Sequence, residues 1–427
     1  MTFFDRFHEI RTGFERPFWV ANLSELFERL SYYAAFASLA RYLHETLNFR
    51  VEQASSLTGL FGGLVWFLAA FGGTLADRLG FRRSLSLAYL ILSCSYFLLG
   101  SIGSPWLAPV RNAMPLGVLV TVVLMLPALG IALVKPCVVG TTARASKENV
   151  RSIGYSIYYT LVNIGGAAGP YVASWVHQHM RVENVFRVAA LSVFAMFFAV
   201  LLFFKEPRRS DETQTVSLGQ AARNFATVIG NPRFMLFLLI FSGYWVVYWQ
   251  EFIILPLYIH DYINPKTTEL ILITGPLTVI SLQMVVSFLS PRIPAFTAIT
   301  LGTLLSGLAW IILIAHPTVP MAVVTLFTVS LGEITQSPRY YEYISRLAPK
   351  GQQGTYMGFA FLPIGIGSLI GGWFGGMLIH HFGEVMHQPG RIWWCVTAVG
   401  VATAALLWIY DKTLRTSSAA PTQSRAI

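Results

Sequence analysis

The sequence predicts an all-α membrane protein with twelve transmembrane helices arranged in two six-helix bundles. Hydrophobic residues make up 55% of the 427 residues and charged residues only 12%, which is about half the charge of a typical soluble domain. The hydrophobic residues come in blocks of about 20, the length of a membrane-spanning helix. A polar and basic stretch near the middle of the chain separates the first six blocks from the next six.

Each block predicts one helix. The twelve spans are expected at residues 18–46, 53–76, 84–103, 114–142, 150–177, 185–204, 233–262, 268–290, 294–315, 319–346, 352–380 and 391–411. The polar stretch divides the chain into an N-terminal bundle (1–204), a cytoplasmic linker (205–232) and a C-terminal bundle with a short tail (233–427). The fifth and eleventh blocks are both rich in glycine, which is typical of two related six-helix halves.

The distribution of basic residues predicts the orientation. About 20 of the 30 Lys and Arg residues lie in the termini and the even-numbered connections, so the positive-inside rule places both termini in the cytoplasm. The net charge of +10 therefore reflects membrane topology and not nucleic-acid binding. We expect no cleavable signal peptide ahead of the first block. We expect a monomeric, multi-pass protein embedded in the lipid bilayer of the inner (plasma) membrane.

The connection between the second and third blocks combines glycine, aspartate and arginine. It runs from Gly73 through Asp77 and Arg78 to Arg82 and Arg83, and it resembles the signature that the major facilitator superfamily carries between its second and third helices. A carboxylate can bind the positive N-terminal end of a neighbouring helix, so we expect these residues to form a cytoplasmic gating latch. The plainer alternative is a basic loop without a gating role.

Three charged residues lie inside the first block. Glu25, Glu28 and Arg29 are spaced so that they share one helix face. Charge inside a membrane span is costly and usually faces a bundle interior or a water-filled cavity. Tyr32 and Phe36 continue the same face, so we expect it to line a central cavity.

Two further blocks of the N-terminal half carry polar residues at depth. Lys135 lies well inside the fourth block and precedes a proline, which favours a functional cation over one that snorkels to the interface. Tyr159 and Asn163 lie four residues apart in the fifth block and share a face. They are candidates for lining the cavity, whereas the glycines around them are typical of close helix packing.

The seventh and tenth blocks place charge in the C-terminal half. Glu251 lies in the seventh block and Glu333 deep in the tenth, so both carboxyl groups are candidates for the cavity. Arg339 and Glu342 lie three residues apart nearer the cytoplasmic end. For this pair, a structural ion pair competes with a gating role.

Together these residues predict proton-coupled alternating access. A carboxyl group that moves between a buried environment and a nearby cation changes its proton affinity, so rocking of the two halves would load and release a proton. The sequence contains no nucleophile elbow, nucleotide-binding loop or metal-ligand spacing. We therefore expect a transporter of protons and a small-molecule substrate, not an enzyme, without a cofactor or metal. His380, His381 and His387 are expected to be exposed loop residues rather than metal ligands.

The same residues resemble the motifs of the proton-dependent oligopeptide transporter family. The matching segments are Glu25-x-x-Glu28-Arg29 with Ser31-Tyr32-Tyr33, Lys135-Pro136, Tyr159-x-x-x-Asn163-Ile164-Gly165, Trp245 with Gln250, and Gly332-Glu333. The resemblance implies proton coupling through Glu25, Glu28, Arg29 and Lys135, and a peptide amino terminus at Glu333. We expect the substrate site to include Tyr32, Tyr33, Phe36, Lys135, Tyr159, Asn163, Trp245, Gln250, Glu251 and Glu333.

The sequence departs from the family pattern in three places. Phe36 stands where the family has an arginine that helps to hold the peptide carboxylate, and Cys137 stands where it has an asparagine. The linker is also too short for the two extra helices that many bacterial members insert between the halves. The resemblance therefore supports proton coupling more strongly than it supports a peptide as the substrate.

Two other functions remain open from the sequence. A proton-driven exporter of drug-like or metabolite molecules is one, because Gly165-x-x-x-Gly169-Pro170 partly matches an antiporter motif. A receptor that senses a solute without transporting it is the other, although the short C-terminal tail argues against it. The charged residues of the first and fourth blocks favour an importer of small peptides or of a related amine-bearing solute.

Overall fold

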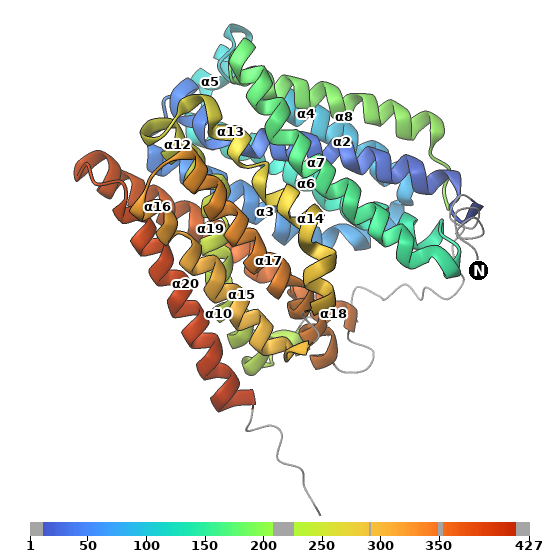
Figure 1. The fold of residues 1–427 in the computed structure, drawn as a ribbon. Coiled ribbons are helices and arrows are strands. Elements are labelled where there is room, and N and C mark those ends of the chain that lie inside the picture. Colours follow the sequence, from blue (N-terminus) through green and yellow to red (C-terminus); the bar gives the residue numbers. More distant parts are fainter. Residues whose placement is uncertain (1–11, 208–225, 290–291, 349–352, 416–427) are drawn as a thin grey trace, which may run out of the picture.

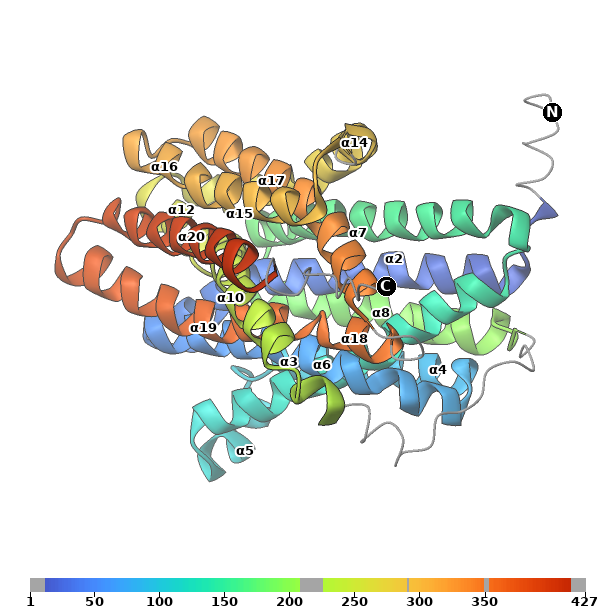
Figure 2. The ribbon, with the colours of Figure 1, turned by 90° about the horizontal axis from the view of Figure 1, so that it is seen from below.

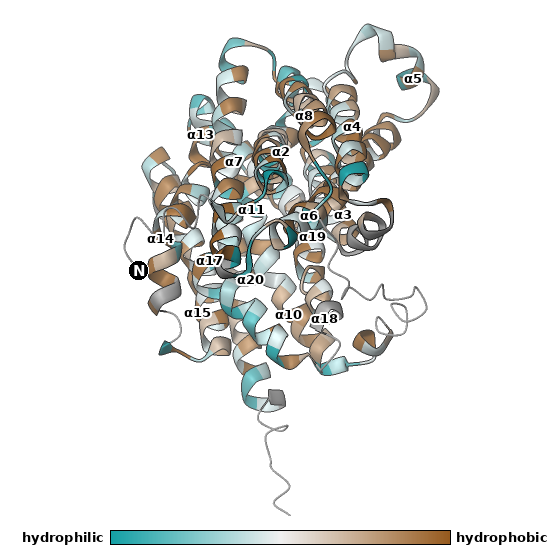
Figure 3. Ribbon diagram, turned by 90° about the vertical axis from the view of Figure 1, so that its right-hand side faces the viewer, coloured by the Kyte–Doolittle hydropathy of each residue, from teal (hydrophilic) through white to brown (hydrophobic). Residues whose placement is uncertain are grey.

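A computed structural model describes residues 12–207, 226–289, 292–348 and 353–415 of the chain. Long helices make up these residues, and they form an N-terminal and a C-terminal group that lie side by side (Figures 1 and 2). Hydrophobic residues predominate along the helices (Figure 3), and many large hydrophobic side chains are exposed, among them Trp19, Leu191 and Met284. An apolar exterior is what a bundle within a lipid bilayer requires.

The first six predicted spans are six long helices. They are α2 (Arg16–Arg41, continued by one wide turn at Tyr42–Thr46), α3 (Val51–Leu79), α4 (Phe81–Leu99), α6 (Leu116–Arg144), α7 (Arg151–His179) and α8 (Glu183–Phe203). A short helix, α5 (Ala108–Ala113), lies in the connection between α4 and α6. Each long helix begins and ends within a few residues of its predicted block.

The next six spans are also present, but four of them are interrupted. They comprise α10 to α12 (Pro232–Tyr248, Gln250–Ile253, Leu255–Tyr262), α13 and α14 (Thr268–Ile271, Thr274–Leu289), α15 and α16 (Ala295–Ala309, Ile311–Ala315), α17 (Val319–Leu347), α18 and α19 (Gln353–Phe359, Leu362–Leu378) and α20 (Arg391–Tyr410). Pro256 and Pro363 lie in the first turns of α12 and α19. Because proline cannot donate the backbone hydrogen bond of a continuous helix, it accounts for these two interruptions.

Eight of the described helices are long and apolar enough to cross a membrane by length and composition alone. They correspond to the fourth span and to the sixth through twelfth spans. The other four spans, α2, α3, α4 and α7, contain 19 to 29 residues each. At 1.5 Å of rise per residue they are also close to or beyond the length that a bilayer needs.

Glycines allow equivalent helix pairs to pack closely in both halves. A Cβ atom on Gly165 or Gly169 of α7 would lie within 2.7 Å of backbone oxygens of α2, and one on Gly367 of α19 would lie 2.2 Å from Trp245 of α10. The fifth helix therefore packs on the first as the eleventh packs on the seventh. This repeated arrangement agrees with two related halves.

A second glycine face of α19 joins the two halves. The Ser368 hydroxyl donates a hydrogen bond of 2.9 Å to the Gly59 carbonyl of α3, and a Cβ atom on Gly372 would lie 2.7 Å from the Cα of Gly59. We call the end of the molecule that carries the connections at 47–50, 180–182, 263–264 and 386–390 the distal end. The close contact between α3 and α19 runs from this end toward the middle of the bundle. The predicted bundle boundaries at 204 and 233 stay a prediction.

Candidate functional site

The first charge cluster lies on α2 and combines two carboxylates with one guanidinium group. The Nε atom of Arg29 lies 2.5 Å from Oε2 of Glu28 and 3.5 Å from Oε1 of Glu25. All three residues are buried, with 2% exposure or less. Both oxygens of Glu25 and Oε1 of Glu28 have no hydrogen-bond partner among the described residues. The cluster thus carries one negative charge in excess unless it binds a proton.

Lys135 extends this cluster from α6. Its charge acts on Glu25, Glu28 and Arg29, so α2 and α6 place these groups near one another. The Nζ atom lies 4.5 Å from the ring centroid of Trp66 in α3. Trp66 in turn stacks on Phe361 of the C-terminal half, with ring centroids 5.6 Å apart. The lysine is therefore held beside the contact between the halves by a cation–π interaction.

The second charge cluster lies in the C-terminal half and contains carboxyl groups alone. Tyr248 lies within reach of the Glu333 carboxyl group of α17, and the charge of Glu333 acts on Tyr33 and Tyr159 of the N-terminal half. Glu251 of α11 is 1% exposed and has no hydrogen-bond or ion-pair partner in the described part of the chain. Glu333 is the charge that acts on it.

Tyr159 and Asn163 lie on α7, where 45% of the Tyr159 side chain is exposed. The Nδ2 atom of Asn163 donates a hydrogen bond of 2.9 Å to the Tyr159 carbonyl. Tyr33 is half-buried on α2. The charge of Glu333 acts on both Tyr33 and Tyr159. The structure therefore brings these two predicted site residues toward the second cluster.

Trp245 and Gln250 hold the seventh helix against the eleventh. The Nε2 atom of Gln250 donates hydrogen bonds to the carbonyls of Val246 and Gly371, at 2.8 and 3.2 Å. Trp245 packs against Gly367 of α19. In this conformation both residues contribute to helix packing, and their role in binding a substrate stays a prediction.

Phe36 lies in an aromatic cluster that joins the two halves. Its ring centroid lies 5.3 Å from that of Trp249 and 5.8 Å from those of Phe61 and Phe252, and Tyr32 lies 5.5 Å away. The residue is buried. The position where the peptide-transporter motif has an arginine is therefore filled by apolar packing, and it offers no charge to a substrate carboxylate.

The predicted latch is described only in part, because the side chains of Gly73, Asp77 and Arg78 lie outside the described ones. The Glu206 carboxylate accepts hydrogen bonds of 2.8 Å from the backbone N–H groups of Phe81 and Arg82. The Arg82 side chain donates to the Leu201 carbonyl at 2.7 Å, and Arg83 is exposed. Glu206, which the sequence analysis did not single out, thus caps the N-terminus of α4.

Arg339 and Glu342 of α17 form an ion pair. Arg339 also donates a hydrogen bond of 2.8 Å to the Ile293 carbonyl, and Arg346 lies 2.6 Å from the other oxygen of Glu342. These contacts all lie within the C-terminal half. They agree with the structural interpretation of the pair, and a gating role stays a prediction.

A buried ion pair between the halves was missed in the sequence. Nη1 of Arg41, the last residue of α2, lies 2.9 Å from Oε1 of Glu269 in α13, and both side chains are 2% exposed. Arg41 also contacts Glu45 at 3.0 Å and His177 at 3.1 Å. The spacing of Arg41 and Glu45 predicts a local pair, but nothing in the sequence indicates that Glu269 joins them.

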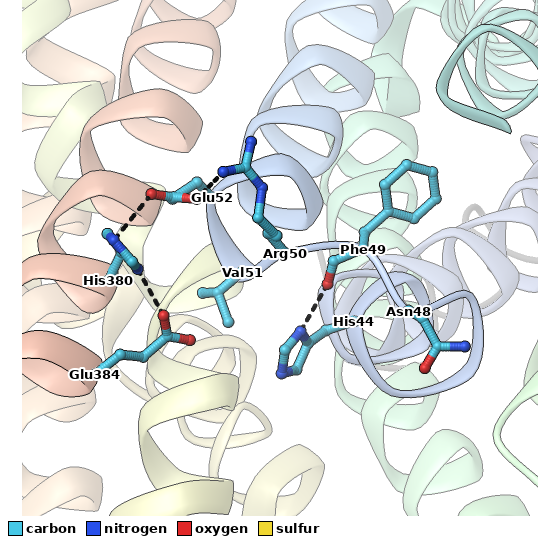
Figure 4. A pocket seen from close by; sticks show the side chains of 8 residues that line it. All are labelled: His44, Asn48, Phe49, Arg50, Val51, Glu52, His380 and Glu384. Atoms are coloured by element: carbon cyan, nitrogen blue, oxygen red, sulfur yellow. Dashed lines mark hydrogen bonds and ion pairs between the residues drawn. The ribbon is translucent and has the colours of Figure 1, made fainter. Parts of the chain in front are cut away.

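A pocket of about 320 Å³ also lies at the distal end between the halves (Figure 4). It is lined by residues 44, 48–52, 380 and 384. His380 contacts Glu52 of the opposite half and Glu384 of its own (Figure 4). The sequence predicted an exposed loop residue at position 380. The structure adds that the His380 imidazole contacts both halves.

The described residues form twelve helical spans in two halves, with charged residues between them, and this arrangement is typical of a membrane transporter. The family model of the Major Facilitator Superfamily matches residues 22–362 and 262–426. The chain therefore belongs to the major facilitator superfamily, and it is a multi-pass membrane transporter rather than an enzyme.

Known proteins resemble the chain in two different ways. Multidrug resistance protein MdtH of Enterobacter sp. (strain 638) is 23% identical over 371 residues, which cover 86% of this chain and 88% of the relative. MdtH of Salmonella arizonae is 23% identical and covers 84% and 86%. A solved POT family transporter in complex with a thioalcohol conjugated peptide gives a TM-score of 0.75 at 17% identity, over 93% and 96% of the two chains. A second, in complex with 5-aminolevulinic acid, gives 0.74 at 18% over the same shares. At identities this low, the two solved structures show a shared fold and nothing beyond it.

Proposed function

We propose that the protein is a proton-coupled symporter that imports small peptides or a related amine-bearing solute by alternating access. The observation that carries the proposal is the buried cluster of Glu25, Glu28 and Arg29. Two carboxylates share one guanidinium group there, and three carboxylate oxygens lack a hydrogen-bond partner among the described residues. A buried excess charge is costly, so a proton on one carboxyl group would balance these three residues whenever Lys135 does not.

Lys135 provides the means to release this proton. Its charge already acts on both carboxylates, and its ring partner Trp66 stacks on Phe361 of the other half. Lys135 and the cluster belong to the same half, so rocking would move the lysine relative to the cluster through the contact of Trp66 with Phe361. A cation that approaches a carboxyl group favours loss of its proton, so the rocking motion and proton release would be linked.

Glu333 is the proposed site for a substrate amine. Its carboxylate has tyrosines of both halves around it, which suits an ammonium group attached to an apolar body. The buried aromatic cluster at Phe36 offers no cation for a peptide carboxylate. Amine recognition is therefore better supported than recognition of a peptide C-terminus.

The proposal includes an orientation for the chain. With both termini in the cytoplasm, the distal end faces the outside of the inner membrane, and the contacts between α3 and α19 close that side in the present conformation. The latch residues, Asp77 foremost, would close the opposite side. The basic residues at the termini and the even-numbered connections support this orientation.

Export of drug-like molecules is the second candidate. It is favoured by the MdtH relatives, which carry the name multidrug resistance protein and match more than four fifths of this chain. The aromatic cluster around Phe36 would also suit an apolar solute. In such an exporter, the same α2 cluster would exchange protons against the substrate in the opposite direction.

Purified protein in liposomes with an internal pH dye tests the proposal. Di- and tripeptide mixtures are added outside under an inward-negative potential, and internal acidification is followed. We expect acidification with the wild-type chain and its loss in Glu28→Gln and Glu333→Gln. Glu148→Gln, a change at an exposed carboxylate, is the matched control and should transport normally.

Each other outcome has a defined meaning. Counterflow of another amine-bearing solute without a peptide response would keep proton coupling and discard the peptide. Acidification that requires substrate loaded inside the liposomes, with none for substrate added outside, would replace import by export. Acidification that persists unchanged in Glu28→Gln would overturn the proposed role of the α2 cluster.

A further inference from the structure

Glu251 is a buried carboxylate that neither the proposed proton cluster nor the proposed amine site uses. It lies on α11, is 1% exposed, and has no hydrogen-bond or ion-pair partner in the described part of the chain. A substrate amine at Glu333 would leave the charge of Glu251 uncompensated. Because an unpaired charge inside a membrane span is costly, this carboxylate requires a partner of its own.

The Ser330 hydroxyl of α17 lies beside this carboxylate. A Cβ atom on Gly275 of α14 would be 2.9 Å from Oε1 of Glu251 and 3.5 Å from Oγ of Ser330, so the two oxygens border the same point. Ser330 is 1% exposed, and its hydroxyl has no hydrogen-bond partner among the described residues. Buried polar groups in proteins almost always have a partner, so this hydroxyl points to a ligand.

Gly275 allows these oxygens to meet at the backbone of α14. A side chain at this position would come within 2.9 Å of the Glu251 carboxylate and would displace it. Gly275 is the second residue of α14, and the N-terminal end of a helix carries a partial positive charge that favours an ionised carboxylate. The partial charge does not balance a full negative charge, and a cation at this place would.

Two interrupted transmembrane helices meet at the same point. The seventh span is interrupted at Trp249, two residues before Glu251, and the eighth at 272–273, two residues before Gly275. Pro276 has no N–H group, so it leaves the carbonyl four residues earlier without its helical donor. In transporters, discontinuous helices of this kind provide backbone carbonyls that coordinate a coupling ion.

The geometry favours a metal cation over a proton. The Ser330 hydroxyl has no hydrogen bond to Glu251, so a proton on the carboxyl group would leave the hydroxyl without a partner. A hard cation binds oxygen ligands at about 2.3–2.6 Å when it has the size of Ca²⁺, and it can hold both oxygens at once. Na⁺ has nearly this radius, and its single charge matches the single carboxylate, whereas Ca²⁺ sites usually contain several carboxylates.

We propose that Glu251 and Ser330 form a sodium site, for which Gly275 leaves the space. The ion would compensate one carboxylate of the C-terminal half, as a substrate amine would compensate Glu333. The sequence predicted no metal because a site of this kind has no characteristic ligand spacing. Binding of the ion does not depend on the proposed function. Its part in transport rests on the proposed alternating access, since an ion at so buried a site exchanges only when the helices around it move.

Binding of radioactive sodium to the full-length protein tests the site. The purified chain is studied in detergent at neutral pH, with choline chloride as the balancing salt. We expect saturable binding of one sodium ion per chain in the wild type. Glu251→Gln should abolish this binding, and Ser330→Ala should weaken it about tenfold or more, because it removes one oxygen from a charged ligand.

Thr325→Val is the matched control. Thr325 is buried in the same helix as Ser330, but its hydroxyl already donates to the Met321 carbonyl at 2.8 Å. This variant should bind sodium as the wild type does. Thermal unfolding in choline chloride shows which variants are folded, and Ser330→Ala decides the question if Glu251→Gln is not. Absence of saturable binding in the wild type, or wild-type binding in the folded site variants, would overturn the site.

Substrate-driven acidification in proteoliposomes separates this inference from the proposed function. If the wild type couples protons to uptake but binds no sodium, the sodium site is overturned and the proposed function stands. If sodium binding depends on Glu251 but no substrate drives acidification, the sodium site stands and the proposed proton coupling fails. If both hold, external sodium should raise the uptake rate of the wild type several-fold and leave that of Ser330→Ala unchanged; an equal rise in both would overturn the part of this site in transport.

Discussion

The two halves of the protein bury carboxyl groups in different ways. In the N-terminal half, Glu25 and Glu28 lie within 3.5 Å of a guanidinium nitrogen on the same helix. In the C-terminal half, Glu251 and Glu333 act on each other, and no basic side chain pairs with them in the described residues. The first pair of acids therefore shares one internal cation, whereas the second has none in the described residues.

This difference assigns different partners to the two clusters. Glu25, Glu28 and Arg29 alone are one charge from neutrality, so either a single proton or the charge of Lys135 can balance them, and a closer Lys135 favours loss of the proton. A cation that enters between the halves would offset one of the two C-terminal carboxylates, and a substrate amine is such a cation. Transport would couple these two events because both clusters lie beside the contact between the halves.

The largest effect is expected from removing the internal cation of the first cluster. Arg29→Gln removes the counter-charge that contacts the two buried carboxylates and leaves them only the more distant Lys135, and breaking a buried ion pair in this way costs about 3–5 kcal/mol. We expect a corresponding fall in the free energy of unfolding, measured by denaturation in detergent micelles, together with loss of transport.

A neutral variant sharpens the same comparison. Replacing Glu25, Glu28 and Arg29 together by glutamine removes the cluster's charge, so it should cost less stability than Arg29→Gln alone. It should nevertheless lack proton-coupled uptake. Equal destabilisation in both variants would show that packing, and not charge balance, determines the cost.

A smaller effect is expected from Glu333→Gln. The substitution keeps the shape of the side chain but removes the charge offered to an amine, and hydrogen bonds to charged groups contribute about 1.5–3 kcal/mol. We expect the substrate concentration for half-maximal uptake to rise about tenfold or more, with thermal stability little changed. An equal loss for a substrate whose amine is acetylated would contradict this role.

The smallest effect is expected at Trp66. Its ring lies 4.5 Å from Lys135 Nζ, and cation–π interactions contribute about 0.5–2 kcal/mol. Trp66→Phe should keep most of this interaction, while Trp66→Ala should slow proton-driven uptake several-fold and leave counterflow closer to normal. If the two variants transport equally, the ring does not position the lysine.

The fold could be predicted from sequence because the length of a hydrophobic block is a local property. The α6 helix, predicted at 114–142, is observed at Leu116–Arg144. The interruption near Trp249 could not be placed, since no proline or glycine marks it in the sequence between Tyr244 and Leu255. The sequence also identified Glu25, Glu28 and Arg29, because three charges in an apolar run stand out.

Contacts between distant segments were beyond such reasoning. Arg41 and Glu269 lie 228 residues apart and pair in the structure at 2.9 Å, although each alone resembles an ordinary charge near a helix end. Phe36 was identified as a departure from a family motif, but its contact with Trp249 depends on how the halves meet.

The central claim is that the two clusters have separate partners, and one pair of variants tests it most directly. Proteoliposomes with Glu28→Gln or Glu333→Gln are assayed for counterflow of a labelled dipeptide and for substrate-driven acidification. We predict that Glu28→Gln keeps counterflow and loses acidification, whereas Glu333→Gln loses both. Loss of counterflow in Glu28→Gln, together with normal counterflow in Glu333→Gln, would contradict the assignment of proton and substrate to the two halves.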